Sequence, residues 1–178
     1  MAIIAILQYP DPRLKRIATP ITKEQLATLS TNAKIQKIID DMFETCFSAE
    51  NCAALAATQL DLLTPYAITV LNLGGEYEPM CLINPTITES SGEQHESEGC
   101  MSVMPNKGIS ARVTRAQSVV VEGYDRAGRP IRVCAEGYEA KAFQHEIDHL
   151  NGKTYLDRLP VEKREMVLKR MKEIEKAR

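Results

Sequence analysis

The 178-residue sequence has no large excess of charge of either sign and no hydrophobic run long enough to cross a bilayer. Its 22 basic and 24 acidic residues give a formal charge of −2, which indicates neither DNA nor membrane binding. The first seven residues are apolar but too few to span a membrane, and no basic residue precedes them, so we expect a strand and not a signal peptide. The sequence also lacks repeats and linkers, so residues 1–178 are expected to form a single domain.

Cysteine is sparse and odd in number, with five residues in the chain. An odd count without a signal peptide points to a reducing cytoplasm, where thiols are free to bind metal. Cys46 continues an apolar helical stripe, and Cys81 and Cys134 fall in strand-like runs, so these three, together with Cys52, are expected to be structural. Cys100 follows a polar stretch and is the cysteine best placed to be a ligand.

Histidine is also rare, and two of the three histidines lie in the segment Gln144–His149. His145 and His149 are four residues apart, so on a helix they share one face and can hold one metal ion. Glu146 is turned off that face and can reach a water molecule on the metal as a general base. The pattern HExxH therefore predicts a hydrolytic metal site, against the alternative that the two histidines merely share a helix surface.

The residues around this motif favour a helix of several turns. Ala142, Phe143, Ile147 and Leu150 recur at helical spacing, and Gly152 is suited to end the helix. A catalytic site needs a third protein ligand. The remaining histidine, His95, lies in a polar, loop-like stretch and is expected to be solvated, so Cys100 is the better candidate, against the alternative that it is only a small buried hydrophobic residue. Asp148 is either a helix-surface acid or a hydrogen-bond partner that orients a metal-binding histidine.

Further elements follow from periodicity and turn chemistry. An apolar stripe from Ile35 to Phe47 predicts a helix, preceded by the capping candidates Ser30, Thr31 and Asn32. Strands are expected over 66–71, 80–83, 118–124 and 130–135, with 125–129 as a hairpin turn between the last two. The tail from Pro160 to Arg178 predicts a second surface helix whose apolar side is formed by Val167, Leu168, Met171 and Ile174.

Three segments together resemble the motifs of the peptide deformylase family. Glu98–Ser102 is similar to EGCLS, Gln144–Gly152 is similar to QHExDHLxG, and Cys52–Gln59 partly matches GxGLAAxQ. They occur in the family's order. The resemblance extends to Tyr9–Leu14, Asp40–Thr45 and Ile83–Pro85, and so covers nearly the whole chain.

The resemblance implies an α+β fold with antiparallel β-sheets packed around a central HExxH helix, and a C-terminal surface helix. It implies metal-dependent removal of the N-formyl group from the N-terminal methionine of nascent polypeptides, with release of formate. Cys100, His145 and His149 would bind one divalent metal, Fe²⁺ in the cell and Zn²⁺ or Ni²⁺ in preparations. Glu146 would be the base, and the side chain of Gln59 and the backbone N–H of Met101 would bind the oxyanion.

Partners and alternatives follow from the same resemblance. The tail helix has seven basic and four acidic residues, a net charge of +3, and either is simply solvated with spaced ion pairs or contacts the ribosome. No DNA or membrane partner is expected. The alternatives in function are a diverged deformylase-like amidase with another small N-acyl substrate, and a catalytically silent, ribosome-associated metal-binding module.

The sequence departs from the family pattern around the expected substrate cleft. Cys52 and Ala54 replace two glycines of the first motif, and the insert Met104–Gly108 lengthens the segment after Cys100. Glu96 and Lys141 stand where apolar residues are usual, and either pair across the pocket mouth or hold their charges in water. The residues expected to bind substrate are Ala54, Leu55, Glu96, Glu98, Gly99, Tyr138, Lys141 and Ala142.

Overall fold

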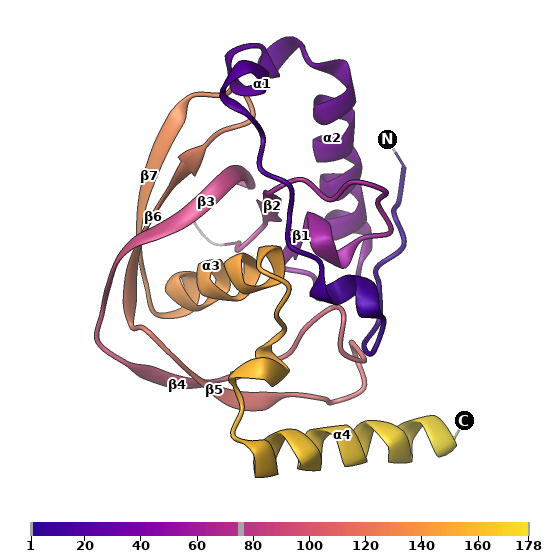
Figure 1. The fold of residues 1–178 in the computed structure, drawn as a ribbon. Coiled ribbons are helices and arrows are strands. Elements are labelled where there is room, and N and C mark those ends of the chain that lie inside the picture. Colours follow the sequence, from indigo (N-terminus) through magenta and orange to yellow (C-terminus); the bar gives the residue numbers. More distant parts are fainter. Residues whose placement is uncertain (1, 75–76, 178) are drawn as a thin grey trace.

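A computed structural model describes residues 2–74 and 77–177, and its elements are arranged as Figure 1 shows. The α-helices are α1 (Lys23–Ala27), α2 (Ala33–Ser48), α3 (Gly137–Leu150) and α4 (Val161–Lys176). The strands are β1 (Ala54–Ala56), β2 (Ile68–Leu71), β3 (Met80–Ser91), β4 (Gln94–Glu98), β5 (Ala111–Arg115), β6 (Ser118–Tyr124) and β7 (Pro130–Glu136). Short 3-10 helices cover Pro12–Lys15, Leu29–Thr31, Ala57–Gln59 and Tyr155–Arg158.

The strands form two antiparallel sheets. One has five strands in the order β1-β2-β3-β6-β7, and the other is a two-stranded ribbon of β4 and β5. The predicted hairpin of β6 and β7 is confirmed, because residues 118–124 pair along their length with 130–136. In the turn, the carboxylate of Asp125 accepts from the backbone N–H groups of Ala127 and Arg129. The predicted α+β class with antiparallel sheets is therefore confirmed.

Strand β3 is much longer than the predicted strand over 80–83. Its pairing with β6 shifts register between Ile83 and Thr86 and again between Ile87 and Glu89. Gly123 makes the first irregularity possible, since a Cβ there would lie 2.8 Å from the Ile83 carbonyl oxygen. The outer half of β3 is exposed and polar, so it lacks the alternation that predicts a strand.

Two local predictions are wrong. Of residues 90–94, expected to be a loop, only Gly92 and Glu93 lie outside β3 and β4. His95 lies on β4, where it is exposed as expected and its ring is hydrogen-bonded to Thr114. Residues 2–7 form no named strand and make only an isolated bridge through Ile6, while residue 1 lies outside the described residues. Their backbone instead follows α2, where Asp41 and Thr45 side chains accept from it.

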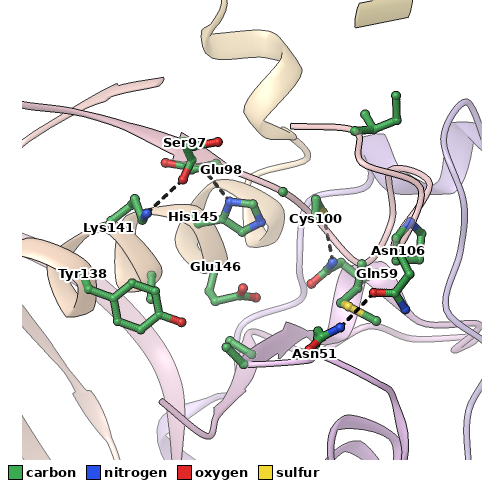
Figure 2. A pocket seen from close by; sticks show the side chains of 17 residues that line it. Asn51, Gln59, Ser97, Glu98, Cys100, Asn106, Tyr138, Lys141, His145 and Glu146 are labelled. Atoms are coloured by element: carbon green, nitrogen blue, oxygen red, sulfur yellow. Dashed lines mark hydrogen bonds and ion pairs between the residues drawn. The ribbon is translucent and has the colours of Figure 1, made fainter. Parts of the chain in front are cut away.

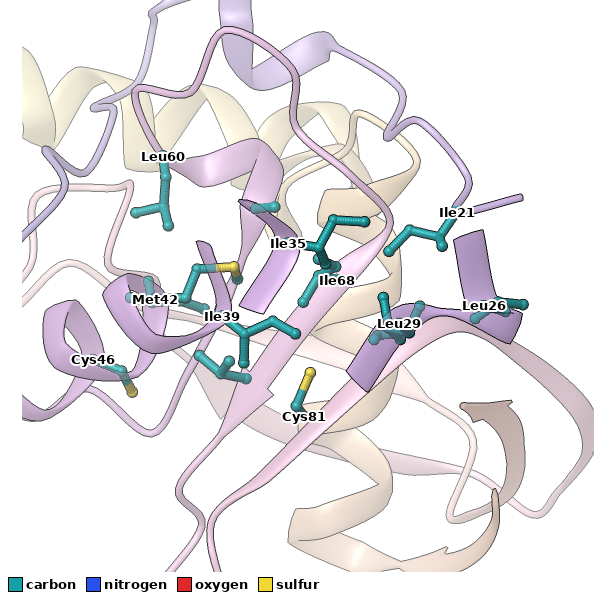
Figure 3. Packing of buried hydrophobic residues seen from close by; sticks show 14 of the residues in the cluster. Ile21, Leu26, Leu29, Ile35, Ile39, Met42, Cys46, Leu60, Ile68 and Cys81 are labelled. Atoms are coloured by element: carbon teal, nitrogen blue, oxygen red, sulfur yellow. The ribbon is translucent and has the colours of Figure 1, made fainter. Parts of the chain in front are cut away.

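Helix α2 covers one face of β1 and β2. Asn32 caps it by accepting from the Ile35 N–H at 3.2 Å, as one of the three candidates was expected to do. Its predicted stripe is buried or partly buried except at its end, where Phe47 is exposed. Figure 3 shows Ile39 and Met42 of this stripe near Ile68 of β2. This packing fixes the position of β1, which forms one wall of the site described below.

Helix α3 lies at the centre of the molecule, between the five-stranded sheet and the β4–β5 ribbon (Figure 1). Ala140 and Phe143 are buried against the sheet. The helix ends at Leu150, and Gly152 follows with a φ of 72°, as the sequence predicted. A Cβ at Gly152 would lie 2.5 Å from the Lys15 carbonyl oxygen, so glycine also permits a close crossing of the chain.

Helix α4 packs beside the β4–β5 ribbon through its predicted apolar side. Met171 is buried in a cluster with Val113, Tyr155 and Leu156, and the other three predicted residues pack against the same cluster. Among the described residues, no helix combines the length and the apolarity that crossing a bilayer requires.

Candidate metal centre

The three predicted ligand residues meet at one point. The Sγ atom of Cys100 lies 3.2 Å from Nε2 of His149, and the two Nε2 atoms of His145 and His149 are 3.1 Å apart. All three ligand atoms lie within 4.8 Å of one another. Tetrahedral coordination at ordinary bond lengths would separate two nitrogens by about 3.3 Å and a nitrogen and a sulfur by about 3.6 Å. The side chains therefore fit a single small metal ion, and His95 is not part of the cluster.

Two elements bring these atoms together. Helix α3 places His145 and His149 on one face, with ring centroids 4.8 Å apart. Cys100 follows β4 directly, and its sulfur accepts from the Ser102 N–H at 3.4 Å and from the Gln59 amide at 3.6 Å. These two donors hold the sulfur in place beside the imidazole of His149.

Glu98 orients the first histidine. Nδ1 of His145 donates to Oε2 of Glu98 at 2.8 Å, which leaves Nε2 directed at the cluster (Figure 2). Burial raises the pKa of Glu98, but hydrogen bonds from Arg115 and His145 outweigh it and lower the pKa to about 2. Glu98 therefore remains a charged acceptor.

The two imidazoles have opposite electrostatic surroundings. Burial lowers the pKa of His149 well below its usual value, so this ring is neutral, as a ligand must be. Burial also lowers the pKa of His145, but Cys100 and Glu98 raise it by more. A cation held by Nε2 of His145 would oppose this rise in the pKa of His145, because its positive charge disfavours a protonated ring.

A network of four charged side chains supports the site, of which three are buried and the fourth, Arg158, is half-exposed. The guanidinium of Arg115 binds both carboxylate oxygens of Glu98, at 2.7 and 2.9 Å, and donates to Asp148 at 2.6 Å. Arg158 also binds both oxygens of Asp148, at 2.9 and 2.6 Å. Asp148 is thus neither of the expected alternatives, since it is buried and its bonded partners among the described residues are arginines.

Arg115 and Arg158 were not predicted as part of the site. The sequence holds one signal that could have indicated them: Glu98 and Asp148 flank predicted ligands in buried segments, and a buried carboxylate requires a cation. The sequence does not say which of its 22 basic residues supplies it.

Glu146 and Gln59 lie beside the ligands and face the same cavity (Figure 2). Oε2 of Glu146 is buried and has no hydrogen-bond partner among the described residues. Burial is the main cause that raises the pKa of Glu146 to about 7. The side-chain oxygen Oε1 of Gln59 accepts from the Ala56 N–H at 2.9 Å. This turns the side-chain amide nitrogen of Gln59 toward Cys100 and Ser102. One acid and one amide donor are therefore held close to the cluster.

The cavity has a volume of about 320 Å³ and opens between β1, β4 and α3. Its wall includes six of the eight residues expected to bind substrate, namely Ala54, Glu98, Gly99, Tyr138, Lys141 and Ala142, together with the predicted oxyanion residue Met101. Leu55 and Glu96 do not line it. Leu55 alternates with Ala54 on β1 and points into the core, and Glu96 is exposed on β4.

Lys141 does not pair with Glu96 among the described residues. Its ammonium group donates to the Ser97 carbonyl oxygen at 3.0 Å and lies 5.4 Å from the centre of the Tyr138 ring. The stem of Lys141 therefore lies along the cavity wall, and its ammonium group binds the backbone of β4.

Residues that the sequence did not single out close the opposite side. Asn51 donates to Asn106 at 3.1 Å across the cavity mouth, and Asn106 lies in the predicted insert, which thus forms part of the wall (Figure 2). Both asparagines have a positive φ, of 59° and 61°, a conformation that asparagine adopts more readily than most residues.

Comparison with known proteins gives consistent similarities. Residues 3–165 match the family model described as polypeptide deformylase. A protein named peptide deformylase 1 from Coxiella burnetii is 50% identical over 167 residues, which are 93% of each chain. A peptide deformylase structure from Legionella pneumophila superposes with a TM-score of 0.84 at 35% identity, covering 99% of this chain and 97% of that one. The peptide deformylase of Ehrlichia chaffeensis, solved in complex with actinonin, has a TM-score of 0.82 at 32% identity, with coverages of 98% and 99%.

The hydrogen bond from His145 to Glu98 generates a prediction for metal affinity. Glu98→Gln keeps the shape of the side chain but removes the charge that holds the ring, so we expect zinc affinity to fall roughly 10- to 100-fold. Competition with a chromogenic chelator measures it. Glu96→Gln, two residues away on the same exposed strand, should leave the affinity unchanged. Equal affinities in the two folded variants would show that Glu98 does not orient the ligand.

Proposed function

The chain belongs to the polypeptide deformylase family, and on that premise we propose that it hydrolyses the N-formyl group of N-formylmethionyl polypeptides as a single-domain enzyme and releases formate. One observation carries the proposal for this chain. Cys100 and His145 of the metal cluster line the same cavity as a buried carboxylate, Glu146, and an oriented amide, Gln59. Holding a metal requires neither of these two groups, whereas hydrolysis requires both a base and an oxyanion donor.

We propose Fe²⁺ as the metal in the cell, with Zn²⁺ or Ni²⁺ in preparations. One thiolate and two imidazoles are a donor set that all three ions accept, so the choice rests on the family resemblance. When bound, the ion supplies Lewis acidity, which lowers the pKa of water to about 7 and makes hydroxide available at neutral pH. Metal analysis of protein purified without oxygen tests the assignment.

The protein's own groups then move the proton and stabilise the charge. Glu146 accepts the proton of the attacking water and returns it to the leaving amine. The Gln59 amide and the backbone N–H of Met101 donate to the formyl oxygen as it gains negative charge. Gln59 is prepared for this role because its own oxygen is already held by Ala56.

Strand β4 offers a surface for the peptide. It pairs with β5 along one edge only, and Ser97, Glu98 and Gly99 line the cavity. An extended peptide can add to such an edge through backbone hydrogen bonds, which accept many sequences. Ala53 and Ala54 form the facing wall and leave room because their side chains are small.

Glu146 gives the decisive test of hydrolysis. In the iron- or nickel-loaded enzyme, Glu146→Gln should retain the metal and lower formate release from formyl-Met-Ala-Ser by roughly 10²- to 10⁴-fold, because no other group takes the proton. Glu136→Gln, at the exposed start of the same helix, is the matched control. Wild-type turnover in Glu146→Gln would remove this residue from the mechanism.

The wild-type assay also separates the alternatives in function. Release of acetate from an acetylated analogue, in place of formate from formyl-Met-Ala-Ser, would indicate the diverged amidase. Activity on neither compound would favour the silent metal-binding module.

Lys141 should limit the affinity for methionine. A thioether that enters the cavity must displace or desolvate an ammonium group bound to Ser97, at a cost comparable to a hydrogen bond, about 0.5–1.5 kcal/mol. Lys141→Ile should therefore raise kcat/KM for formyl-Met-Ala-Ser by roughly two- to tenfold. Glu96→Ile should have no such effect, since Glu96 does not line the cavity. Unchanged kcat/KM in Lys141→Ile would show that the lysine does not restrict this substrate.

We further propose that α4 contacts ribosomal RNA and that the enzyme is cytoplasmic. All five cysteines are free thiols, which suits a reducing compartment. The apolar side of α4 packs inward, and Lys169, Lys172 and Lys176 are exposed on its other side. Among the described residues, the ion pair that involves α4 is Arg164 with Asp157, so these lysines keep their charge for an outside partner.

The RNA contact can be tested without disturbing the packing of α4. The double variant Lys169→Glu, Lys172→Glu should weaken co-sedimentation with ribosomes. The slope of log affinity against log salt concentration should fall in magnitude by about two, because two phosphate contacts are lost. Formate release should be unchanged. The same change of charge at Lys23 and Lys34, exposed at α1 and α2, is the control. Equal co-sedimentation of the two variants would reject the contact.

A further inference from the structure

Two buried cysteines outside the metal centre face each other. The Sγ atoms of Cys46 and Cys52 are 3.4 Å apart, and the residues are 1% and 9% exposed. Cys46 lies in the last turn of α2, where Figure 3 shows it at the edge of the core. Cys52 follows the turn through Asn51 and immediately precedes the cavity wall at Ala53 and Ala54.

The surrounding hydrogen bonds hold the two sulfurs in this arrangement. The Cys52 thiol lies within reach of both the Cys46 sulfur and the Ala54 carbonyl oxygen, at 3.4 and 3.5 Å. The Cys46 sulfur in turn lies 3.6 Å from the carbonyl oxygen of Cys52. A disulfide bond is about 2.05 Å long, so the sulfurs need to approach by only about 1.4 Å. Side-chain rotation and a small shift of the turn can supply a movement of this size.

We propose that Cys46 and Cys52 form a modification site at which a peroxide produces an intramolecular disulfide, separate from the metal centre. The sulfur of Cys46 attacks one oxygen of hydrogen peroxide, the O–O bond breaks, and water leaves with the thiol proton. The resulting sulfenic acid of Cys46 is attacked by the Cys52 sulfur. The S–S bond forms as the S–O bond breaks, and the hydroxyl group leaves as a second water with the Cys52 proton. The two thiols together lose two electrons, which the peroxide gains.

The order of attack follows from the hydrogen bond between the thiols. Donation by the Cys52 thiol lowers the pKa of Cys46, which makes Cys46 the better nucleophile. The same contact and burial raise the pKa of Cys52, which keeps its proton until the second step. The product would fasten the start of β1 to the end of α2, beside a wall of the cavity.

Peptide mapping of the metal-loaded enzyme tests the proposal, with Cys100 held by nickel. After limited hydrogen peroxide, free thiols are alkylated under denaturing conditions and the chain is cut after glutamate. Cleavage after Glu44 and Glu50 places Cys46 and Cys52 in different peptides. We expect a linked pair of peptides about 2 Da lighter than their sum, which a phosphine reductant separates.

Variants assign the link. Cys134→Ala removes an exposed thiol and should leave the linked pair in place, whereas Cys52→Ala should abolish it. The wild-type result stands alone if Cys52→Ala folds poorly. Full alkylation of Cys46 and Cys52 after a dose that oxidises Cys134 would overturn the proposal, as would linkage of either residue only to another cysteine. None of these readouts depends on deformylase activity.

Discussion

The metal centre depends on the ion pairs that the buried guanidinium of Arg115 makes with two carboxylates. The guanidinium binds Glu98, two residues before Cys100, and Asp148, one residue before His149. The ligands come from segments far apart in the sequence, and a single cation sets the distance between them. Burying a charge costs several kcal/mol unless it is paired, so the buried Glu98, Asp148 and Arg115 are stable only together, and the half-exposed Arg158 adds a second partner for Asp148.

Helix α3 connects this network to the cavity. Different sides of the helix contribute Asp148 to the arginines and Phe143 to the core, while His145 and Glu146 face the cavity. One turn earlier, Lys141 lines the same cavity. The chemistry and the substrate wall thus share one rigid element, whose position is fixed by packing against the five-stranded sheet.

Much of this arrangement could be predicted from the sequence, because periodicity and motif spacing are local properties. They located α2, α3, α4 and the β6–β7 hairpin, and they selected His145 and His149, whereas the choice of Cys100 as the third ligand rested on the family resemblance. Features set by distant partners were missed. The polar outer half of β3 has no alternation of its own, the first residues follow α2 and not a strand, and no local signal joins Arg115 to Glu98. The same limitation applies to Leu55 and Glu96, because the sequence does not show which side of a strand faces a cavity.

The amide bridge between Asn51 and Asn106 has a consequence for the cavity mouth. Both residues have a left-handed backbone conformation in the structure, and the hydrogen bond between them forms without a change of backbone torsion in either loop. Neither amide is charged, so added electrolyte does not screen the contact and acidification does not titrate it. The aperture is therefore set by the shapes of two turns, and its width should be indifferent to the ionic composition of the surroundings.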